Sequence, residues 1–354
     1  MEEGNNCKKV YGVGLIGFAH VHALGYAKTF QAGPGTKLIA VADSNVERGK
    51  EGANALGMKD FYSDPREMLE RDDIDIVCIT SETARHAEYA VTAAEAGKHI
   101  CMEKVLDITL KRADRIIKAA EKAGVKLICP PFPHDFNPVL LKIKEFIDSG
   151  YIGKPHFAHW HIGHGGVGQR WSEWFYDPKE AGGGALIDLG VHPIYQALYL
   201  FGEAREVLGT KMSVYSERTV GDKHLTNIQT EDNAVTVTIF KNDVMSVSDV
   251  SFARKKDLSN NAIYGTEGTI VLNSPFASLT VYSTKMSEEW RGWNMPEIRL
   301  PISPKDQMEL FLNLIEKEEG TWRVNGKWAR DVLEIVLASY KSAETKKVIT
   351  LPLR

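Results

Sequence analysis

The fold is decided where the sequence reads VYGVGLIGFAHVH, from Val10 to His22. An apolar, β-favouring run opens this stretch, and residues 23–30 after it suit a helix. A strand, a tight turn and a helix in this order are typical of a parallel sheet that holds a pyrophosphate on the helix N-terminus. The pattern G-x-G-x-x-G is degraded, because Gly17 matches it but Ala19 and His22 stand at the second and third glycines. We therefore expect the His22 side chain to point away from the turn, or the helix to stand off from the strand.

A second buried-strand pattern, residues 37–42, ends at Asp43, 21 positions after His22. An acidic residue near this spacing hydrogen-bonds the ribose of NAD and repels the 2′-phosphate of NADP. The alternative is that Asp43 caps the helix that contains Glu47 and Arg48. Because Arg48 is cationic and close in sequence, NAD is the expected cofactor and NADP stays possible.

Strands and helices continue to alternate along the first part of the chain. Apolar runs predict strands at 75–80, 99–102 and 125–129, and helices at 83–96 and 110–123. This order predicts a doubly wound parallel sheet that binds ligands at the carboxyl ends of its strands. The residues at that edge are Gly17, Asp43, Ser81, Thr83, Glu103 and Lys104. A lysine directly after a buried strand favours a functional role for Lys104; the alternative is a surface lysine paired with Glu103.

The pattern changes after Pro130 and Pro131. A helix at 138–149 precedes runs of period two, which predict antiparallel strands with one covered face. These runs are 234–240, 244–252, 269–272 and 279–282, and helices are predicted at 306–318 and 329–345. We therefore expect two domains: a Rossmann domain over 1–131, and a domain over 132–354 built on an open, mainly antiparallel sheet. The fold class is α/β plus α+β.

Composition excludes several classes of protein. The 354 residues are 43% hydrophobic and 25% charged, with a net charge of −4, so neither nucleic acid nor an anionic membrane is an expected partner. No apolar run is long enough to span a membrane, and the first residues lack the apolar core of a signal peptide. The four cysteines form no C-x-x-C pair and suit buried thiols in a reducing compartment. A soluble, cytoplasmic protein is expected.

A third stretch, GGGALIDLGVHP at 182–193, combines three glycines with an apolar run that can start a helix. Asp188 and His192 are four residues apart, so a helix would present both on one face. A carboxylate beside an imidazole is a compact acid/base pair, because it orients the ring and supports its protonated form. The alternative is that the two side chains bond only each other or solvent.

Glu103-Lys104-Val105 together with Gly182–His192 resembles the Gfo/Idh/MocA family of NAD(P)-dependent oxidoreductases, which carries Glu-Lys-Pro and G-G-G-x-L-x-D-x-G-x-H at these places. Further similar runs lie at 85–88, 95–99, 149–155, 338–343 and 348–352, so the likeness spans nearly the whole chain. The sequence departs from the family at Val105, which stands in place of proline. It also departs at 80–83, which reads TSET, and at Tyr195, where a polar residue is common.

The resemblance implies a hydride transfer between a nicotinamide and a hydroxyl-bearing carbon of a sugar, polyol or related small molecule. His192 would accept the hydroxyl proton, Lys104 would hold and polarise the same oxygen, and Asp188 would orient the pair. The family also packs its open sheet against a second copy, so a dimer or tetramer is expected. The residues expected to contact the cofactor are Gly17, Phe18, Ala19, His20, Asp43, Ser81, Thr83, His86, Glu103 and Lys104.

Several residues between the two main motifs suit a polar substrate pocket. His156, His159, His161 and His164 lie close enough in sequence to suggest a metal site. On a strand, however, His159 and His161 share one face and the other two fall on the opposite face, so the four cannot converge and no metal is expected. The residues expected to contact substrate are Lys104, His134, His159, His161, Trp171, Asp188 and His192.

Three further readings stay open beside the dehydrogenase. One is a glycoside-cleaving enzyme that uses tightly held NAD in a cycle of oxidation, elimination and re-reduction. Another is a non-catalytic NAD-binding module, which the degraded glycine pattern and Val105 would suit. The last is a metal hydrolase built on residues 156–164.

Overall fold

The computed structural model describes residues 9–129, 138–166, 172–255, 261–272, 279–285, 292–294, 307–317 and 325–353. The chain forms two compact units. The first comprises Met1–Asp107, Lys111–Pro130 and Lys305–Lys327, and the second comprises Ile108–Leu110, Pro131–Pro304 and Trp328–Arg354. The described residues 307–317 and 325–327 thus belong to the first unit, whereas the sequence pattern places them in the second domain.

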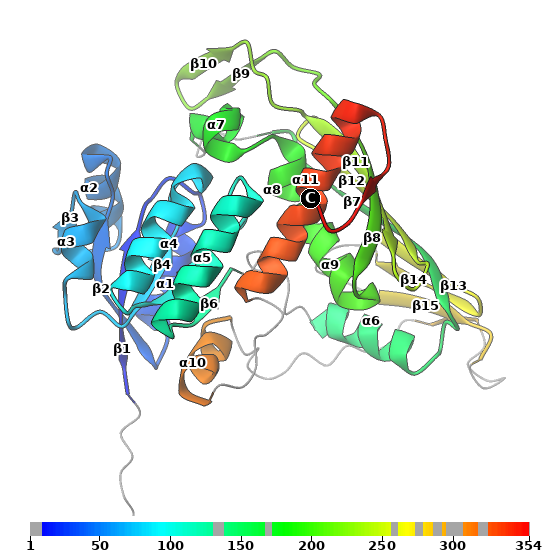
Figure 1. The fold of residues 1–354 in the computed structure, drawn as a ribbon, viewed down its shortest axis with the longest axis horizontal. Helices are drawn as coiled ribbons and strands as arrows, with labels where there is room; N and C mark the ends of the chain where they lie inside the picture. The colour runs from blue at the N-terminus through cyan, green and yellow to red at the C-terminus, as the bar shows by residue number, and fades with distance from the viewer. Residues whose placement is uncertain are drawn as a thin grey trace, which may run out of the picture. The chain divides into compact units, whose positions relative to one another are not determined.

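The first unit is a parallel sheet of six strands in the order β3-β2-β1-β4-β5-β6, with helices between successive strands (Figure 1). Its strands are β1 (Tyr11–Ile16), β2 (Thr36–Ala42), β3 (Phe61–Tyr62), β4 (Ile76–Ile79), β5 (His99–Met102) and β6 (Leu127–Ile128). Its helices are α1 (Ala23–Ala32), α2 (Val46–Ala55), α3 (Pro65–Leu69), α4 (His86–Glu95), α5 (Leu110–Ala123) and α10 (Gln307–Lys317). The strand order reverses at β1 and β4, where such sheets bind their ligands.

The central strands have the composition of a parallel sheet that helices cover on both faces. Every residue of β1 and of β4 is buried, as expected for strands covered by helices on both faces. The doubly wound fold predicted from the sequence is therefore confirmed. Sequence patterning missed β3 and α3, because two and five residues are too few to show a period.

The second unit is built on nine strands in the order β16-β15-β14-β13-β7-β12-β11-β8-β17. All pairs are antiparallel except β7 with β12, which confirms a mainly antiparallel sheet. The strands of this sheet are β7 (Pro155–Gly163), β8 (Ala204–Met212), β11 (Asn233–Phe240), β12 (Met245–Ser251), β13 (Asn261–Gly265), β14 (Gly268–Leu272), β15 (Leu279–Ser283), β16 (Gly292–Asn294) and β17 (Ile349–Thr350). A separate hairpin joins β9 (Glu217–Val220) to β10 (Lys223–Thr226). The helices are α6 (Pro138–Asp148), α7 (Pro178–Ala181), α8 (Ala185–Leu189), α9 (Val191–Phe201) and α11 (Gly326–Thr345).

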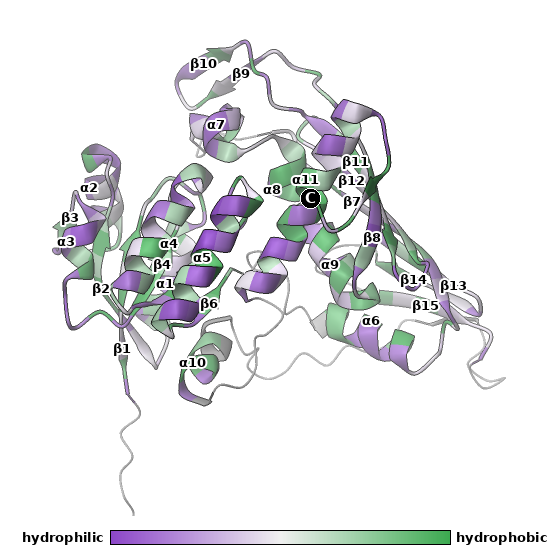
Figure 2. Ribbon diagram, viewed as in Figure 1, coloured by the Kyte–Doolittle hydropathy of each residue, from purple (hydrophilic) through white to green (hydrophobic). Residues whose placement is uncertain are grey.

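Helices α9 and α11 cover one face of this sheet. On β11, Thr236 shares a hydrogen bond of 2.7 Å with Ser339 of α11, and Phe240 packs edge-on against Phe201 of α9. The green colour of α8 and α9 in Figure 2 marks their apolar character, and nearly every residue of α9 is buried. In the described part of the chain, none of the helices is both long enough and apolar enough to cross a membrane.

The other face of the sheet carries the alternate residues. Val237 lies opposite Leu208 of β8 and Val247 of β12, and of these three apolar side chains Leu208 is 41% exposed. Because β-strand side chains alternate, these residues point away from Thr236 and hence away from α11.

Candidate active site

The turn after β1 is built around Gly17. Its φ of +90° suits glycine, and a Cβ atom at this position would lie 2.7 Å from the Cα of Ser81. The Thr80 hydroxyl donates to the carbonyl oxygen of Gly17, and the Thr80 carbonyl accepts the His20 N–H at 3.1 Å. Thr80 therefore holds the turn against the end of β4. The sequence pattern does not indicate this role for Thr80.

Replacing Gly17 with alanine is expected to lower the free energy of unfolding by about 2–3 kcal/mol, because the new methyl group meets backbone at a positive φ. The matched control is Gly57→Ala, whose φ is also positive (65°) but whose Cβ would meet nothing within 4 Å. Urea unfolding of both variants separates the clash from the backbone strain. Equal losses in the two variants would contradict the close approach at Gly17.

Asp43, at the end of β2, fixes the same turn. Its carboxylate accepts the Phe18 N–H at 2.8 Å and the Asn45 N–H at 2.8 Å. The Arg48 guanidinium donates to both Asp43 oxygens, at 2.8 and 2.9 Å, and also to Glu82 at 2.8 Å. The cap of α2 is Asn45, whose side chain accepts the Arg48 N–H at 3.1 Å, so Asp43 is not the helix cap. Asp43 instead links the turn to Arg48, whose positive charge partly neutralises the Asp43 carboxylate.

Glu103, directly after β5, lies under the turn and is fully buried. One carboxylate oxygen is 3.1 Å from Nδ1 of His22 and 3.8 Å from Nδ1 of His20, and the other accepts the Lys104 N–H at 3.1 Å. Burial raises the pKa of Glu103, but the electrostatic effects of His20, His22 and Lys104 lower it by a larger amount, so the net pKa is well below its ordinary value. The carboxylate is therefore ionised at neutral pH. As expected from the degraded glycine pattern, His22 points away from the turn, toward this carboxylate.

The segment after Lys104 is held by side chains from α4 and α5. Nδ1 of the buried His86 bonds the Val105 carbonyl at 2.8 Å, and the Lys104–Val105 peptide bond is cis. Asp107 accepts the Ala87 N–H at 3.2 Å and pairs with Arg112 at 2.8 Å. His86, which we expect to contact the cofactor, thus also positions the segment that carries Lys104.

Stability is expected to depend on pH through His86. Burial lowers the pKa of His86 below its ordinary value of 6.5, which outweighs the opposing effect of Asp107. Below pH 6.5 the unfolded chain takes up this proton before the folded chain does, so the stabilisation is complete above 6.5 and is lost as pH falls. We expect the free energy of unfolding to drop by about 1 kcal/mol from pH 7.5 to 5.5, and by less in His86→Gln. An identical pH slope in the variant would contradict this.

In the second unit, Gly183 and Gly184 let the turn lie close to Tyr340 and to the backbone of Glu231. A Cβ atom on Gly183 would lie 2.1 Å from the Tyr340 hydroxyl, and one on Gly184 would lie 2.1 Å from the Glu231 carbonyl oxygen. The Glu231 carboxylate accepts the Gly184 N–H at 3.1 Å, the Leu186 N–H at 2.9 Å and the Tyr340 hydroxyl at 2.8 Å. Glu231 thus holds the N-terminus of α8, where a negative charge is favourable. The sequence pattern missed both Glu231 and Tyr340.

Asp188 lies on α8 and His192 on α9. The sequence predicts a single helix here, whereas the structure divides it at Gly190, whose φ of −64° and ψ of −23° stay helical. The two side chains are therefore still carried about one helical turn apart, as predicted. Their position is set through Gly184, whose carbonyl accepts the Asp188 N–H at 3.2 Å.

His159 and His161 share one face of β7, as predicted, but it is the face away from α9 and α11. They pair in register with Val247 and Asp249 of β12, and Nδ1 of His161 lies 2.9 Å from Asp249. Within this unit the structure therefore does not bring them together with His192. The other two residues expected at the substrate, His134 and Trp171, lie outside the described residues.

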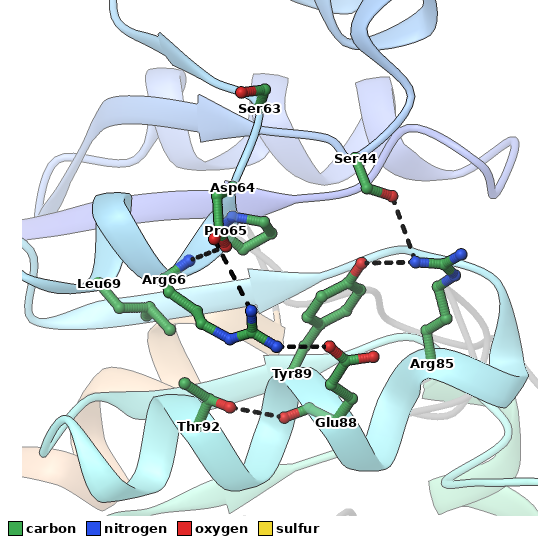
Figure 3. Close-up of a pocket in the computed structure, with 10 residues that line it drawn as sticks. All are labelled: Ser44, Ser63, Asp64, Pro65, Arg66, Leu69, Arg85, Glu88, Tyr89 and Thr92. Carbon is green, nitrogen blue, oxygen red and sulfur yellow. Dashed lines mark hydrogen bonds and ion pairs between the residues drawn. The ribbon is translucent and has the colours of Figure 1, made fainter.

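A cavity of about 240 Å³ lies in the first unit, beyond Ser44. Figure 3 shows Arg85 directed toward Ser44 and Tyr89, and Arg66 directed toward Glu88. The two arginines of the lining are balanced by two acids, Glu88 and Asp64, so the cavity has little net charge.

Fold and sequence together define the class of protein. Residues 10–129 match the profile of the Gfo/Idh/MocA oxidoreductase family with an NAD-binding Rossmann fold, and residues 140–271 match the C-terminal domain of the same family. The chain belongs to this family and is an oxidoreductase with NAD as its cofactor.

Among curated proteins, the chain is 25% identical to myo-inositol 2-dehydrogenase of Thermotoga maritima, over 96% of this chain and 98% of the relative. It is 30% identical to scyllo-inositol 2-dehydrogenase (NAD(+)) of Bacillus subtilis, over 81% of this chain and 79% of the relative. Among solved structures, it resembles levoglucosan dehydrogenase in complex with NADH and L-sorbose, with a TM-score of 0.83 and 25% identity over 98% of this chain and 100% of the other.

Proposed function

We propose that this protein oxidises a ring hydroxyl of a cyclic polyol or sugar to a ketone with NAD as the oxidant, or catalyses the reverse reduction. The observation that carries the proposal is the placement of two segments. Lys104 follows β5 at the ligand-binding edge of the NAD-binding unit. Asp188 stands on α8, whose start Glu231 anchors, and His192 stands on the next helix, α9. Relatives that act on inositols and on levoglucosan support the substrate class.

The residues of the first unit fit a dinucleotide. Gly17 brings the turn close to β4 with no side chain in the way, and no side chain caps the N-terminus of α1, where a pyrophosphate is favourable. Asp43 stands at the strand end that meets the ribose in this fold, where a ribose hydroxyl would replace an Arg48 N–H on its carboxylate and a 2′-phosphate would be disfavoured. Phe18, Ala19, Ser81 and Thr83 would flank the same nucleotide. NAD, when bound, supplies the acceptor for the hydride.

The protein's own part is to handle the proton and the charge on oxygen. In the proposed reaction the substrate carbon loses a hydride, its hydroxyl loses a proton to His192, and a C=O bond replaces the C–O bond. Lys104 donates a hydrogen bond to the oxygen as negative charge develops there. Asp188 orients His192 and stabilises its protonated form.

The test is an assay of the full chain with NAD or NADP and a panel of myo-inositol, scyllo-inositol, levoglucosan and common hexoses. The expected result is NADH formation with at least one cyclic polyol or sugar, and a higher kcat/KM with NAD than with NADP. No turnover of any member of the panel with either cofactor, despite binding of NAD, would overturn the proposal. NAD that co-purifies and shows no net reduction during glycoside cleavage would favour the oxidation–elimination alternative instead.

We also propose that the protein forms a homodimer or tetramer in the cytoplasm through the open face of the nine-stranded sheet. The support is the apolar row of Leu208, Val237 and Val247 on that face. Val237→Lys is expected to shift the molar mass measured by light scattering to that of a monomer. The matched control, Val214→Lys, changes a valine that is 52% exposed outside the sheet and should leave the mass unchanged. A wild-type chain that is monomeric would contradict the proposal.

A further inference from the structure

The turn after β1 and the end of β5 bring three potential metal ligands close together. A ring nitrogen of His20, a ring nitrogen of His22 and a carboxylate oxygen of Glu103 all lie within 4.8 Å of one another. Glu103 is 81 positions from His22 in the sequence, but all three residues belong to the same unit, so their arrangement depends only on the parallel sheet.

The distances suit a small cation. Zn²⁺ binds imidazole nitrogen and carboxylate oxygen at about 2.0–2.2 Å, which separates neighbouring tetrahedral ligands by about 3.4 Å. The Glu103 oxygen lies 3.1 Å from Nδ1 of His22 and 3.8 Å from Nδ1 of His20, on either side of that value. Shifts of a few tenths of an ångström would bring both of these oxygen–nitrogen distances to that value.

The chemistry of the donor atoms also favours a metal. Nδ1 of His20 accepts the His22 N–H at 3.2 Å and is therefore unprotonated in this arrangement; a metal bound to this nitrogen would replace that hydrogen bond. Glu103 is a fully buried carboxylate, whose charge is costly to bury without a compensating cation. Two imidazoles and one carboxylate form a ligand set that zinc sites use, whereas Mg²⁺ prefers oxygen alone.

The site also has a route to solvent. The His22 side chain is 26% exposed, whereas those of His20 and Glu103 are 3% and 0% exposed. A metal held here could therefore exchange past His22 and keep a fourth position for water or another oxygen ligand. We propose that His20, His22 and Glu103 form a binding site for a divalent transition-metal ion, Zn²⁺ foremost.

The second unit offers a natural control, because His159, His161 and Asp249 also lie within 4.8 Å of one another. There, however, Arg254 pairs with the Asp249 carboxylate and already supplies its positive charge. We therefore assign the metal to the first cluster and expect none at the second.

The experiment uses the full chain, stripped with a chelator and studied without nucleotide, so that its outcome does not depend on the proposed catalytic function. Co²⁺ is added while its visible d–d absorption is recorded, and Zn²⁺ is then titrated in competition with a chromophoric chelator. We expect one tight equivalent per chain, a rise in Tm on Zn²⁺ binding, and at least tenfold weaker binding in His22→Asn and Glu103→Gln.

The double variant H159N/H161N should bind the metal as the wild type does. Because Glu103 is buried, its variant could fail to fold; the partly exposed His22→Asn, checked by circular dichroism, then decides. Wild-type binding no tighter than that of His22→Asn would overturn the proposal. So would a loss of binding that follows H159N/H161N instead.

Discussion

An asparagine at position 192 is expected to lower kcat for a ring alcohol by about 10²–10⁴-fold, because the reaction loses the base that accepts the hydroxyl proton. Lys104→Met should lower kcat/KM by about 10²–10³-fold, since no cation then stabilises charge on the oxygen. NAD affinity, measured by quenching of tryptophan fluorescence, should change little in either variant. The acid limb of the kcat/KM–pH profile should disappear in His192→Asn and persist in Lys104→Met.

The matched controls are His224→Asn and Lys241→Met, which change residues with exposed side chains in the second unit. Both should retain wild-type turnover. If His192→Asn keeps more than a tenth of the wild-type kcat with an intact acid limb, the base lies elsewhere. If both active-site variants lose NAD binding as well, the roles assigned to them are wrong.

The second large effect is expected at Glu231, which lies far in the sequence from the residues that we assign to catalysis. Glu231→Ala leaves the N–H groups of Gly184 and Leu186 and the Tyr340 hydroxyl without their common acceptor. Because these groups are buried, the free energy of unfolding should fall by about 3 kcal/mol or more. Since α8 begins at Ala185, loss of its anchor should also displace Asp188, so we expect kcat to fall at least tenfold in the fraction that stays folded.

Two variants separate this anchor from a general effect of losing a glutamate. Tyr340→Phe removes a single donor and should cost about 1–2 kcal/mol. Glu203→Ala changes an exposed side chain and should cost less than about 0.5 kcal/mol. Guanidinium unfolding measures all three. A Glu231→Ala protein as stable as Glu203→Ala would refute the anchoring role.

Much of the fold could be predicted from the sequence, because buried parallel strands and half-covered antiparallel strands leave different periodicities. The helix predicted at 110–123 is α5 to the residue, and the strand predicted at 99–102 is β5. Strand β8 was missed, since Arg205, Glu206 and Lys211 interrupt its apolar alternation. Its position depends on pairing with β11, which a local pattern does not reveal.

The candidate site could be predicted only where its residues follow local motifs. Gly17, Asp43 and Lys104 stand at strand ends, and strand ends can be found from apolar runs. Glu231 could not be found in this way, because its partners lie 45 to 109 positions away. For the same reason, the sequence pattern placed His159 and His161 at the substrate, whereas the register of β7 turns them to the open face.

The hydrogen bond between Thr236 and Ser339 joins the sheet to α11 through polar side chains. Its neighbourhood on the covered face is rich in small hydroxyl groups: Ser246, Ser248 and Ser342 are buried there as well. Apolar side chains in contact can shift along one another at little cost, whereas a hydrogen bond forms only within a narrow range of distances and angles. This hydrogen bond therefore fixes the position of α11 along its own axis on the sheet. Tyr340, the next residue of α11, is consequently held at one position next to Gly183.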